Sequence, residues 1–421
     1  MGPAVMILGI VLMIVIHEAG HFIAAKYFGI KATEAFFGFG PRLWSTTRGE
    51  TEYGVKAIPL GGYVRIIGMN PFEEVAPEDE GRTYRERPFW QKSIVVLAGI
   101  FSHFVVAFIL FYGLAVGYGT PEPETTVQVV SDALVVPSDG EDAVPFVREP
   151  DDRILSVDGV AFAEIDPLAR NDGSTVEVVL DRAGSEVVVT TTDTVVPTPA
   201  WLDGLEAGDR LVALDGVTIA TWDEFVALTR DRPGDAVVIS VDRDGSAVDI
   251  ATVLASRPFD GTEVGFLGVA PDLVTVRSGP IEGVIVAGGD LAEAGKASVA
   301  GLGGLVTNFG TILGATINPD SEVLNEVRPV SPIGLTRVAS TAQIAIALLA
   351  WVNVFVGVLN VVPLYPLDGG HFAVAAYEKL RGRPADIRKM VPVAAAVFAF
   401  IVLLGILGIY FDIVSPLVVP G

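Results

Sequence analysis

The 421-residue chain contains no cysteine. Disulfide bonds, thiol catalysis and thiolate metal sites are therefore all excluded, and a transition metal would have to use histidine and carboxylate ligands. Histidine is itself scarce, with four residues in the chain. Basic residues are also few, 28 against 51 acidic ones, which gives a formal net charge of −23. This acidic excess lies in residues 119–340, and an acidic exterior argues against nucleic acid and against anionic lipid as partners.

Apolar residues, in contrast, are abundant. Hydrophobic residues make up 51% of the chain and the mean hydropathy is +0.52, which indicates a polytopic membrane protein. Besides an apolar run at residues 3–16, three stretches at about 94–117, 342–364 and 391–413 are long enough to cross the hydrocarbon layer at about 1.5 Å per helical residue. Four predicted spans place both ends of the chain on one side of the membrane.

The first apolar run leads directly into the metal-binding pattern His17-Glu18-Ala19-Gly20-His21. Residues four apart share one face of a helix, so His17 and His21 can bind one metal ion while Glu18 stands beside it as a base. Ionisable groups are costly in a lipid-facing segment, so these residues predict a functional site in a protein-lined or water-filled interior. The HExxH pattern has only three fixed positions and also occurs by chance, so the rest of the chain has to decide.

A secretory signal peptide at residues 1–25, with Ala24-Ala25 near a cleavage point, is the alternative interpretation of this segment. Signal peptides begin with basic residues and have an uncharged core. Here the first basic residue is Lys26, after the apolar run. That position favours a spanning helix with an external amino terminus, after which the chain continues in the cytoplasm.

Charged residues are distributed unevenly among the predicted loops. Residues 119–340 contain 13 Lys/Arg and 37 Asp/Glu, which leaves 15 of the 28 basic and 14 of the 51 acidic residues for the rest of the chain. All 15 of these basic residues fall in two loops, at about 26–93 and 365–390. By the positive-inside rule, these two loops are predicted to be cytoplasmic and the acidic segment extracytoplasmic.

The acidic segment contains an internal repeat. Residues 152–160 match residues 209–217, an offset of 57, and residues 173–185 match residues 234–246, an offset of 61. Both copies contain short β-branched runs separated by Asp-Gly turns, which is typical of strands. A helix is predicted in the second copy at about Trp222 to Arg230.

The second copy of the repeat resembles a PDZ domain, and the first is a more degenerate version. The resemblance rests on Gly208-Asp209-Arg210-Leu211, on Leu214-Asp215-Gly216, and on Gly265-Phe266-Leu267-Gly268-Val269, which is similar to the loop that holds a peptide carboxylate. In such domains a peptide adds as a strand to the sheet edge, so a peptide ligand is one expectation. The other is a rigid steric filter that binds no ligand.

A second polar cluster supplies a candidate for the missing metal ligand. A catalytic zinc usually has a third protein ligand besides the two histidines of HExxH. Beside the third predicted span lies Asn360-Val-Val-Pro363-Leu-Tyr-Pro366-Leu-Asp368-Gly369-Gly370-His371. Pro363 and Pro366 cannot continue a regular helix, so the chain is predicted to unwind there and allow Asp368 to turn inward.

Taken together, these features resemble the site-2 proteases, intramembrane zinc metalloproteases, in the bacterial form that cleaves anti-sigma factors. The match covers the whole architecture: HExxH in the first span, PDZ modules between spans two and three, and the Asn-x-x-Pro and Leu-Asp-Gly pattern at the third. The resemblance implies one Zn²⁺ per chain with His17, His21 and Asp368 as ligands and Glu18 as the base. It also implies that Asn360 holds the substrate or the developing oxyanion.

Two glycine-rich stretches fit a further feature of that family. Residues 37–41 and 60–67 are similar to its membrane-associated β-hairpin loop, in which Gly61, Gly62 and Tyr63 would bind an extended substrate. An ordinary cytoplasmic hairpin is the alternative interpretation. The segment at residues 332–334 fits the one that precedes span three.

The second predicted span departs from the family pattern. The family usually has Gly-Pro-x-x-Asn, whereas this chain has Gly99-Ile-Phe-Ser-His103. His103 is therefore a candidate for a hydrogen bond near the site, for packing within the bundle or for a fourth metal ligand. A fourth ligand would close the position that a catalytic zinc keeps open. His371 borders Asp368 and is expected to face the cytoplasmic interface.

The predicted fold is a polytopic α-helical membrane protein of about four transmembrane helices, with inserted extracytoplasmic, mostly-β tandem PDZ-like domains. The expected segments are helix 1 at 1–25, a cytoplasmic loop at 26–93, helix 2 at 94–117, a degenerate PDZ-like domain at 120–192, a PDZ domain at 193–275, an extracytoplasmic amphipathic connector at 276–341, helix 3 at 342–364, a cytoplasmic segment at 365–390 and helix 4 at 391–413. The expected activity is hydrolysis of a membrane-anchored regulator, such as an anti-sigma factor, within or near its transmembrane segment after a first extracytoplasmic cut. The expected location is the bacterial cytoplasmic membrane, with the active site near the cytoplasmic side.

Two rival functions come from other classes of protein. A transporter can use intramembrane His, Glu and Asp in an ion pathway, but it does not need HExxH together with external peptide-binding modules. A PDZ scaffold with an inactive protease core would be expected to have lost metal ligands, and every implied ligand is present in this sequence.

Overall fold

The computed structural model describes residues 1–70, 73–138, 143–149, 151–259, 261–316, 328–383 and 385–415. The chain forms two compact units, one made of Met1–Thr120 with Arg277–Gly421 and the other of Pro121–Val276. Part of the predicted connector, residues 317–327, and the side chain of Leu60 lie outside the described residues.

Among the described residues of the first unit, four helices are long and apolar enough to cross a membrane. They are α1 (Gly2–Tyr27), α2 (Phe89–Gly113, continued by the π-helical turn η2, Leu114–Tyr118), α9 (Ala342–Val361) and α11 (Val391–Val414). Helices long enough to span are therefore found at the four predicted positions. The third ends at Val361, earlier than the predicted residue 364, because Pro363 and Pro366 follow, and helix resumes at Asp368 as α10 (Asp368–Arg381).

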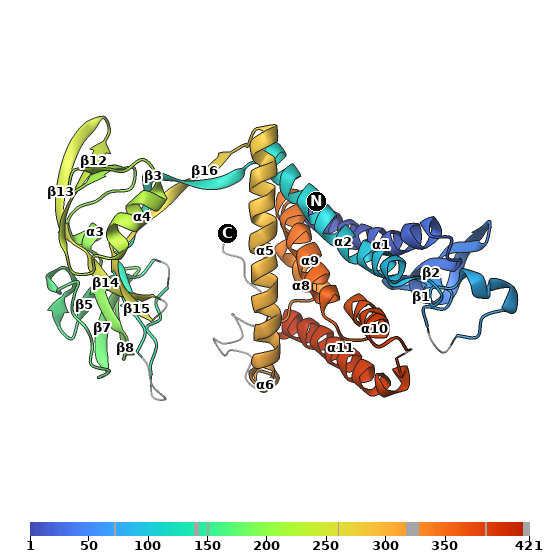
Figure 1. The fold of residues 1–421 in the computed structure, drawn as a ribbon. Coiled ribbons are helices and arrows are strands. Elements are labelled where there is room, and N and C mark those ends of the chain that lie inside the picture. Colours follow the sequence, from blue (N-terminus) through green and yellow to red (C-terminus); the bar gives the residue numbers. More distant parts are fainter. Residues whose placement is uncertain are drawn as a thin grey trace. The chain divides into compact units, whose positions relative to one another are not determined.

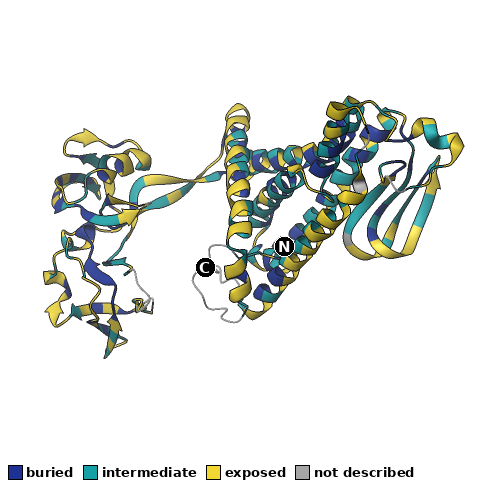
Figure 2. Ribbon diagram, turned by 60° about the horizontal axis from the view of Figure 1, so that its bottom comes forward, coloured by how far each residue is buried: buried dark blue, intermediate teal, exposed yellow. Residues whose placement is uncertain are grey.

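Helices α1, α2 and α9 pack against one another (Figure 1). Small residues allow close approach at these contacts, as is common between membrane helices. A Cβ atom at Gly20 of α1 would lie 2.6 Å from the carbonyl oxygen of Ala98 in α2, and one at Gly9 would lie 2.1 Å from the Leu349 side chain in α9. Buried residues concentrate where the helices meet, and many outward-facing residues are exposed (Figure 2).

Strands β1 (Ala32–Arg48) and β2 (Thr51–Ile66) form a sheet beside α1. Phe36 pairs with both Gly54 and Tyr63, because the two long strands bend and pair with each other more than once. The turn between them is held by Glu50, whose carboxylate accepts hydrogen bonds from Lys26 at the end of α1 (2.5 Å) and Arg82 in η1 (Pro77–Arg82; 2.7 Å). Hydrogen bonds from Arg82 and then Lys26 lower the pKa of Glu50 to about 2. The sheet is thus fixed to the end of the helix that carries HExxH.

In the sequence, three more of the described helices of the first unit come after the second unit and before α9. They are α5 (Pro280–Thr307), α6 (Phe309–Gly314) and α8 (Pro332–Val338), and the short η4 (Ile387–Lys389) precedes α11. Ala287 and Ala294 of α5 are fully buried in an apolar cluster with Phe111 of α2 and Val354 of α9. This long helix therefore packs directly on two of the spans, a contact that the connector assignment did not include.

The second unit is built almost entirely of β-strands. Its elements are β3 (Thr120–Val130), β4 (Ala133–Val136), β5 (Arg153–Val157), β6 (Val160–Ala161), η3 (Phe162–Glu164), β7 (Val176–Arg182), β8 (Ser185–Thr191), β9 (Thr194–Pro197), α3 (Pro199–Leu202), β10 (Arg210–Leu214), β11 (Val217–Thr218), α4 (Trp222–Arg230), β12 (Ala236–Arg243), β13 (Ser246–Val253), β14 (Ala255–Phe259), β15 (Thr262–Phe266) and β16 (Val269–Val276). The predicted helix at 222–230 is α4, which begins with a capping box between Thr221 and Glu224.

The internal repeat is visible as two copies of one strand arrangement. β6, β5, β7 and β8 are neighbours in that order, and β11, β10, β12 and β13 repeat it. Arg182 donates to the carboxylate of Asp152 at 2.6 Å, and Arg243, its counterpart at the offset of 61, donates to Asp209 at 2.7 Å. Both carboxylates belong to nearly fully buried residues. The equivalent sequence positions therefore form equivalent ion pairs.

The Asp-Gly turns of the two copies also match. Asp158 and Asp215 have φ of 48° and 50°, and the glycines that follow them have φ of 77° and 79°. Two successive positive φ angles define a type I′ hairpin turn, for which Asp-Gly is a preferred sequence. This explains the Asp-Gly pair in each copy of the repeat.

Candidate metal centre

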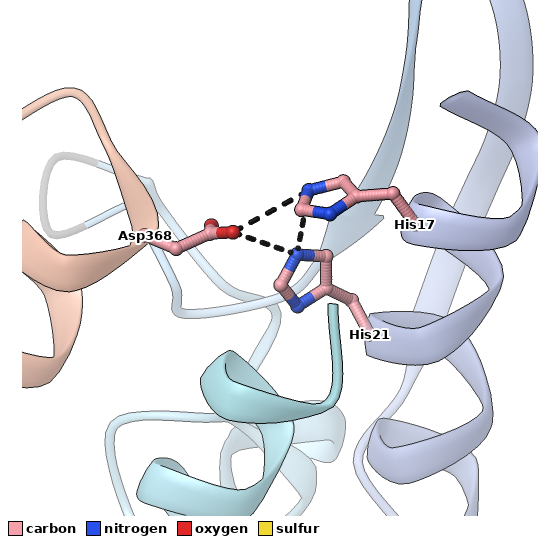
Figure 3. A group of neighbouring side chains, drawn as sticks. All are labelled: His17, His21 and Asp368. Carbon is pink, nitrogen blue, oxygen red and sulfur yellow. Dashed lines mark hydrogen bonds and ion pairs between the residues drawn. The ribbon is translucent and has the colours of Figure 1, made fainter. Parts of the chain in front are cut away.

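Three side chains predicted from the sequence meet between α1 and the start of α10 (Figure 3). The Nε2 atoms of His17 and His21 are 3.2 Å apart, and the Oδ2 atom of Asp368 lies 3.4 Å from the first and 3.3 Å from the second. His21 is buried, and the other two are half-buried. The structure therefore brings together residues that are about 350 positions apart in the sequence.

The hydrogen bonds around this cluster indicate that it can bind a cation. The Nδ1 atom of His21 donates to the backbone oxygen of Val95 at 2.8 Å, so a neutral ring presents the lone pair of Nε2 to Asp368. Oδ2 of Asp368 is buried and has no hydrogen-bond partner of good geometry among the described residues. Two lone-pair atoms that face each other at 3.3 Å repel unless a cation lies between them.

The distances also fit zinc. With bonds of about 2.0–2.1 Å, tetrahedral coordination places ligand atoms about 3.3 Å apart, and the three separations here are 3.2, 3.3 and 3.4 Å. Two imidazoles and one carboxylate form a donor set used by catalytic zinc sites, which leaves the fourth position open. The hydrogen bond from His21 to Val95 fixes the ring orientation, as outer partners of metal-binding histidines commonly do.

Glycines after Asp368 allow the broken helix to bring that residue to the site. A Cβ atom at Gly369 would lie 2.3 Å from the backbone oxygen of Val361, and one at Gly370 would lie 2.6 Å from the backbone nitrogen of Tyr365. The start of α10 can therefore pack directly on the end of α9 only because both residues lack a side chain. This close approach gives a physical reason for the Leu-Asp-Gly-Gly sequence.

Gly99 of α2 is a site residue whose role the sequence did not reveal. A Cβ atom at this position would lie 2.2 Å from Nε2 of His21, the atom that faces Asp368. Real Cβ atoms do not approach that closely, so any larger residue would displace the imidazole. The sequence signal was the match of Gly99 to the glycine of the family's Gly-Pro-x-x-Asn pattern, which does not show that this residue contacts His21.

The predicted base and hairpin residues lie next to each other. A Cβ atom at Gly62 of β2 would lie 3.3 Å from Cγ of Glu18, so β2 runs past the glutamate of HExxH. Gly61 has a φ of 123° and packs against the ring of Phe39. Tyr63 is engaged within the sheet, since its hydroxyl donates to Glu34 and accepts from Lys56.

Asn360 lies half-buried in the last turn of α9, separated from Asp368 by the non-helical residues that follow Val361. The hydrogen bonds and ion pairs found for His17, His21 and Asp368 among the described residues do not involve Asn360. Its predicted role in holding the substrate stays a prediction.

The two other histidines lie in different surroundings. His103 of α2 is buried, and its ring centroid is 4.7 Å from that of His17. His371 of α10 is paired with Tyr365, whose hydroxyl is 3.0 Å from Nδ1 of the imidazole. Burial lowers the pKa of His371 to about 4 and raises the pKa of Tyr365 to about 12, so both are neutral near pH 7.

The predicted carboxylate loop of the second unit, Gly265 to Gly268, is closely packed against its own domain. A Cβ atom at Gly265 would lie 2.1 Å from the backbone oxygen of Thr229 in α4, and one at Gly268 would lie 2.4 Å from the Thr198 side chain. Phe266 is half-buried, and Leu267 belongs to the hydrophobic core.

A histidine pair and a carboxylate that fit zinc, beside a glutamate and among helices apolar enough to cross a membrane, are the features of a membrane-embedded metalloprotease. Comparison with known proteins gives the same class. The model of peptidase family M50 matches residues 5–404. The chain belongs to peptidase family M50 and is a zinc metalloprotease with several membrane spans.

Named relatives match over nearly the whole chain. Zinc metalloprotease Rip1 of Mycobacterium tuberculosis (strain H37Rv) is 30% identical over 450 aligned residues, which cover 99% of this chain and 98% of the relative. Zinc metalloprotease Rip1 of Mycolicibacterium smegmatis is 29% identical with the same coverage. Regulator of sigma-E protease RseP of Escherichia coli (strain K12) is 28% identical over 421 residues, covering 89% of this chain and 90% of the relative.

Proposed function

We propose that His17, His21 and Asp368 hold the catalytic zinc ion and that Glu18 is the general base. The observation that carries this proposal is the set of three ligand atoms separated by 3.2–3.4 Å. The substrate that we propose is a membrane-anchored regulatory protein such as an anti-sigma factor, cut within or near its transmembrane segment after a first extracytoplasmic cleavage. The relative named as a regulator of sigma-E protease supports this substrate class.

Zinc, when bound, lowers the pKa of a coordinated water towards about 7 and polarises the scissile carbonyl. The chain supplies the proton transfers. Glu18 takes the proton of the attacking water and returns it to the leaving amine, and the neighbouring β2 strand limits where its side chain can lie. Hydrolysis therefore needs Glu18 ionised at the start of each cycle.

A transmembrane substrate must be unwound before it is cut, because its carbonyls are engaged in i to i−4 hydrogen bonds. We propose that β2 near Gly61, Gly62 and Tyr63 accepts the unwound segment as an added strand. The contact of Gly62 with Glu18 supports this placement, because a strand bound there would run beside the base. We propose that Asn360 holds the substrate or the oxyanion.

Metal analysis of ligand variants tests the proposed site. Alanine at His17, His21 or Asp368 is expected to remove zinc from the purified protein, because each change deletes one of three ligands. His371→Phe is the matched control, since it removes a half-buried histidine that is not part of the cluster. Zinc is measured per chain by mass spectrometry. Full zinc content in two of the three alanine variants would rule out this ligand set.

Gly99→Ala extends the test without removing a ligand. The new methyl group would displace His21, so zinc affinity is expected to fall about 10–100-fold, the range seen when a ligand's supporting contacts are lost. Gly113→Ala on the same helix is the control, because a Cβ atom there meets nothing within 4 Å.

We propose that the loops 26–93 and 365–390 lie in the cytoplasm and the β-rich unit outside it, with the active site near the cytoplasmic side of the bacterial cytoplasmic membrane. The distribution of basic residues supports this orientation. Because the chain has no cysteine, Ser185→Cys and Ser45→Cys can each be treated with a membrane-impermeant thiol reagent on intact cells. Labelling is expected at residue 185 alone, and the reverse pattern would contradict the orientation.

We infer that the β-rich unit is a tandem of PDZ-like domains that controls access to the site. The repeated strand order and the equivalent ion pairs Arg182–Asp152 and Arg243–Asp209 support two copies of one module. If the unit acts as a steric filter, deleting residues 124–272 is expected to leave zinc binding and cleavage of a short reporter helix intact and to permit cleavage of untrimmed substrate.

Peptide recognition by the same unit predicts a different result. Deletion, or Gly268→Asp in the candidate carboxylate loop, would then slow cleavage of trimmed substrate as well. Rates for trimmed and untrimmed substrate therefore separate the two mechanisms. Rates unchanged from the wild-type protein for both substrates in both variants would exclude either kind of gating.

A further inference from the structure

His103 lies at the edge of the metal cluster but is not part of it. The residue is 3% exposed, and its ring is tilted by 31° to that of His17 at a centroid distance of 4.7 Å. The atoms of His17, His21 and Asp368 form a group within 4.8 Å of one another that does not include either nitrogen of His103. His103 therefore has a role other than that of a fourth ligand in this arrangement.

The hydrogen bonds of Asn353 determine which nitrogen of His103 carries the proton. Nδ2 of Asn353 donates to the backbone oxygen of Leu349 at 2.7 Å, which fixes the orientation of the amide. Oδ1 therefore faces Nδ1 of His103, at 3.2 Å. A carbonyl oxygen only accepts, so Nδ1 carries the proton and Nε2 of the neutral ring presents a lone pair.

The lone pair of His103 Nε2 is buried without a donor. Among the described residues, Nε2 has no hydrogen-bond partner. Buried acceptors in native proteins are nearly always paired with protein or with ordered water, and a buried water is expected where polar groups converge. The ring beside this acceptor is His17, one of the three clustered residues, whose own Nδ1 is also buried without a partner among the described residues. A water molecule that donates to Nε2 of His103 would therefore lie beside the proposed zinc centre.

We propose that His103 Nε2 accepts a hydrogen bond from the catalytic water and positions it for attack. This inference rests on the proposed zinc centre and on Glu18 as the base. A water molecule has two O–H groups, and Glu18 accepts one of them. The second needs an acceptor in a buried site, and His103 of α2 provides one beside the ring of His17. Asn353 acts through His103 by holding its tautomer and is a positioning residue.

The test uses the purified full-length protein with Co²⁺ in place of zinc, because the visible absorption of Co²⁺ responds to the ligand environment without any need for turnover. His103→Phe keeps an aromatic ring and removes the acceptor. It is expected to bind one Co²⁺ per chain with a changed spectrum, and its zinc form to show kcat reduced about 10–100-fold with KM nearly unchanged. Asn353→Leu removes the hydrogen bond that sets the tautomer of His103. It is expected to shift the Co²⁺ spectrum and kcat in the same direction as His103→Phe. His103→Gln restores an acceptor oxygen and is expected to recover part of kcat.

Ser102→Ala is the matched control, because Ser102 donates to the backbone oxygen of Gly99 at 2.6 Å within its own helix. It is expected to leave the spectrum and kcat unchanged. Unchanged spectrum and kcat in His103→Phe would overturn the proposal, as would loss of the bound metal, which indicates a ligand, or a rise in KM alone, which indicates a substrate contact. Failure of the wild-type protein to bind Co²⁺, or full activity of Glu18→Gln, would instead refute the proposed centre itself.

Discussion

Replacing Glu18 by glutamine is expected to lower the rate of peptide hydrolysis by about 10²–10⁴-fold while zinc remains at one ion per chain. Glutamine has nearly the same shape as glutamate but cannot accept the proton of the attacking water. The proposed ligand atoms belong to His17, His21 and Asp368, so the metal should be retained. The measurement pairs zinc analysis with cleavage of a membrane-embedded reporter in detergent.

Glu293→Gln is a suitable control for this change, because Glu293 lies on α5 with its side chain 67% exposed and outside the site. It is expected to retain wild-type activity. A Glu18→Gln protein that cleaves at the wild-type rate would show that another group transfers the proton.

Asp412→Asn is expected to destabilise the first unit by about 3–5 kcal/mol, the range for breaking a buried ion pair. Asp412 of α11 accepts hydrogen bonds from Arg328 (2.9 Å) and from the backbone nitrogens of Ser331 (2.8 Å) and Gly334 (3.0 Å). The side chains of Asp412 and Arg328 are 1% and 4% exposed. Asparagine would leave the guanidinium buried without a counter-charge.

The loss of stability would be measured by denaturant-induced unfolding in detergent micelles. Asp386→Asn is the control, because Asp386 pairs with Lys389 at 3.7 Å on the surface, where both side chains are more than half exposed. An exposed pair contributes less than about 1 kcal/mol. Equal effects of the two changes would show that the Asp412 cluster does not hold α8 against α11.

The main features of the centre could be predicted from the sequence because they depend on local rules. The spacing of His17 and His21 places both on one helix face, and the prolines at 363 and 366 end α9 so that Asp368 can leave the helix direction. The internal repeat could also be predicted from the sequence. In the structure, its matched positions Asp152 and Asp209 form equivalent ion pairs.

Other features depend on contacts between distant segments, which periodicity does not encode. The contact of Gly99 with His21, the burial of Ala287 and Ala294 of α5 against the spans, and the Asp412 cluster each join residues far apart in the sequence. The double pairing of Phe36 was also hidden, because a hairpin pattern does not show where a long strand bends. His103 could be singled out only as a departure from a family pattern, and its partner Asn353 became visible in the structure.

The central claim is that this chain cuts a peptide bond in a membrane segment with zinc held by His17, His21 and Asp368. The most direct measurement is mass spectrometry of the fragments formed when the purified zinc protein is incubated with a single-span reporter in detergent. The account predicts a cut within or next to the apolar segment that disappears with Asp368→Ala. A cut confined to the soluble part of the reporter, or one that persists in that variant, would contradict it.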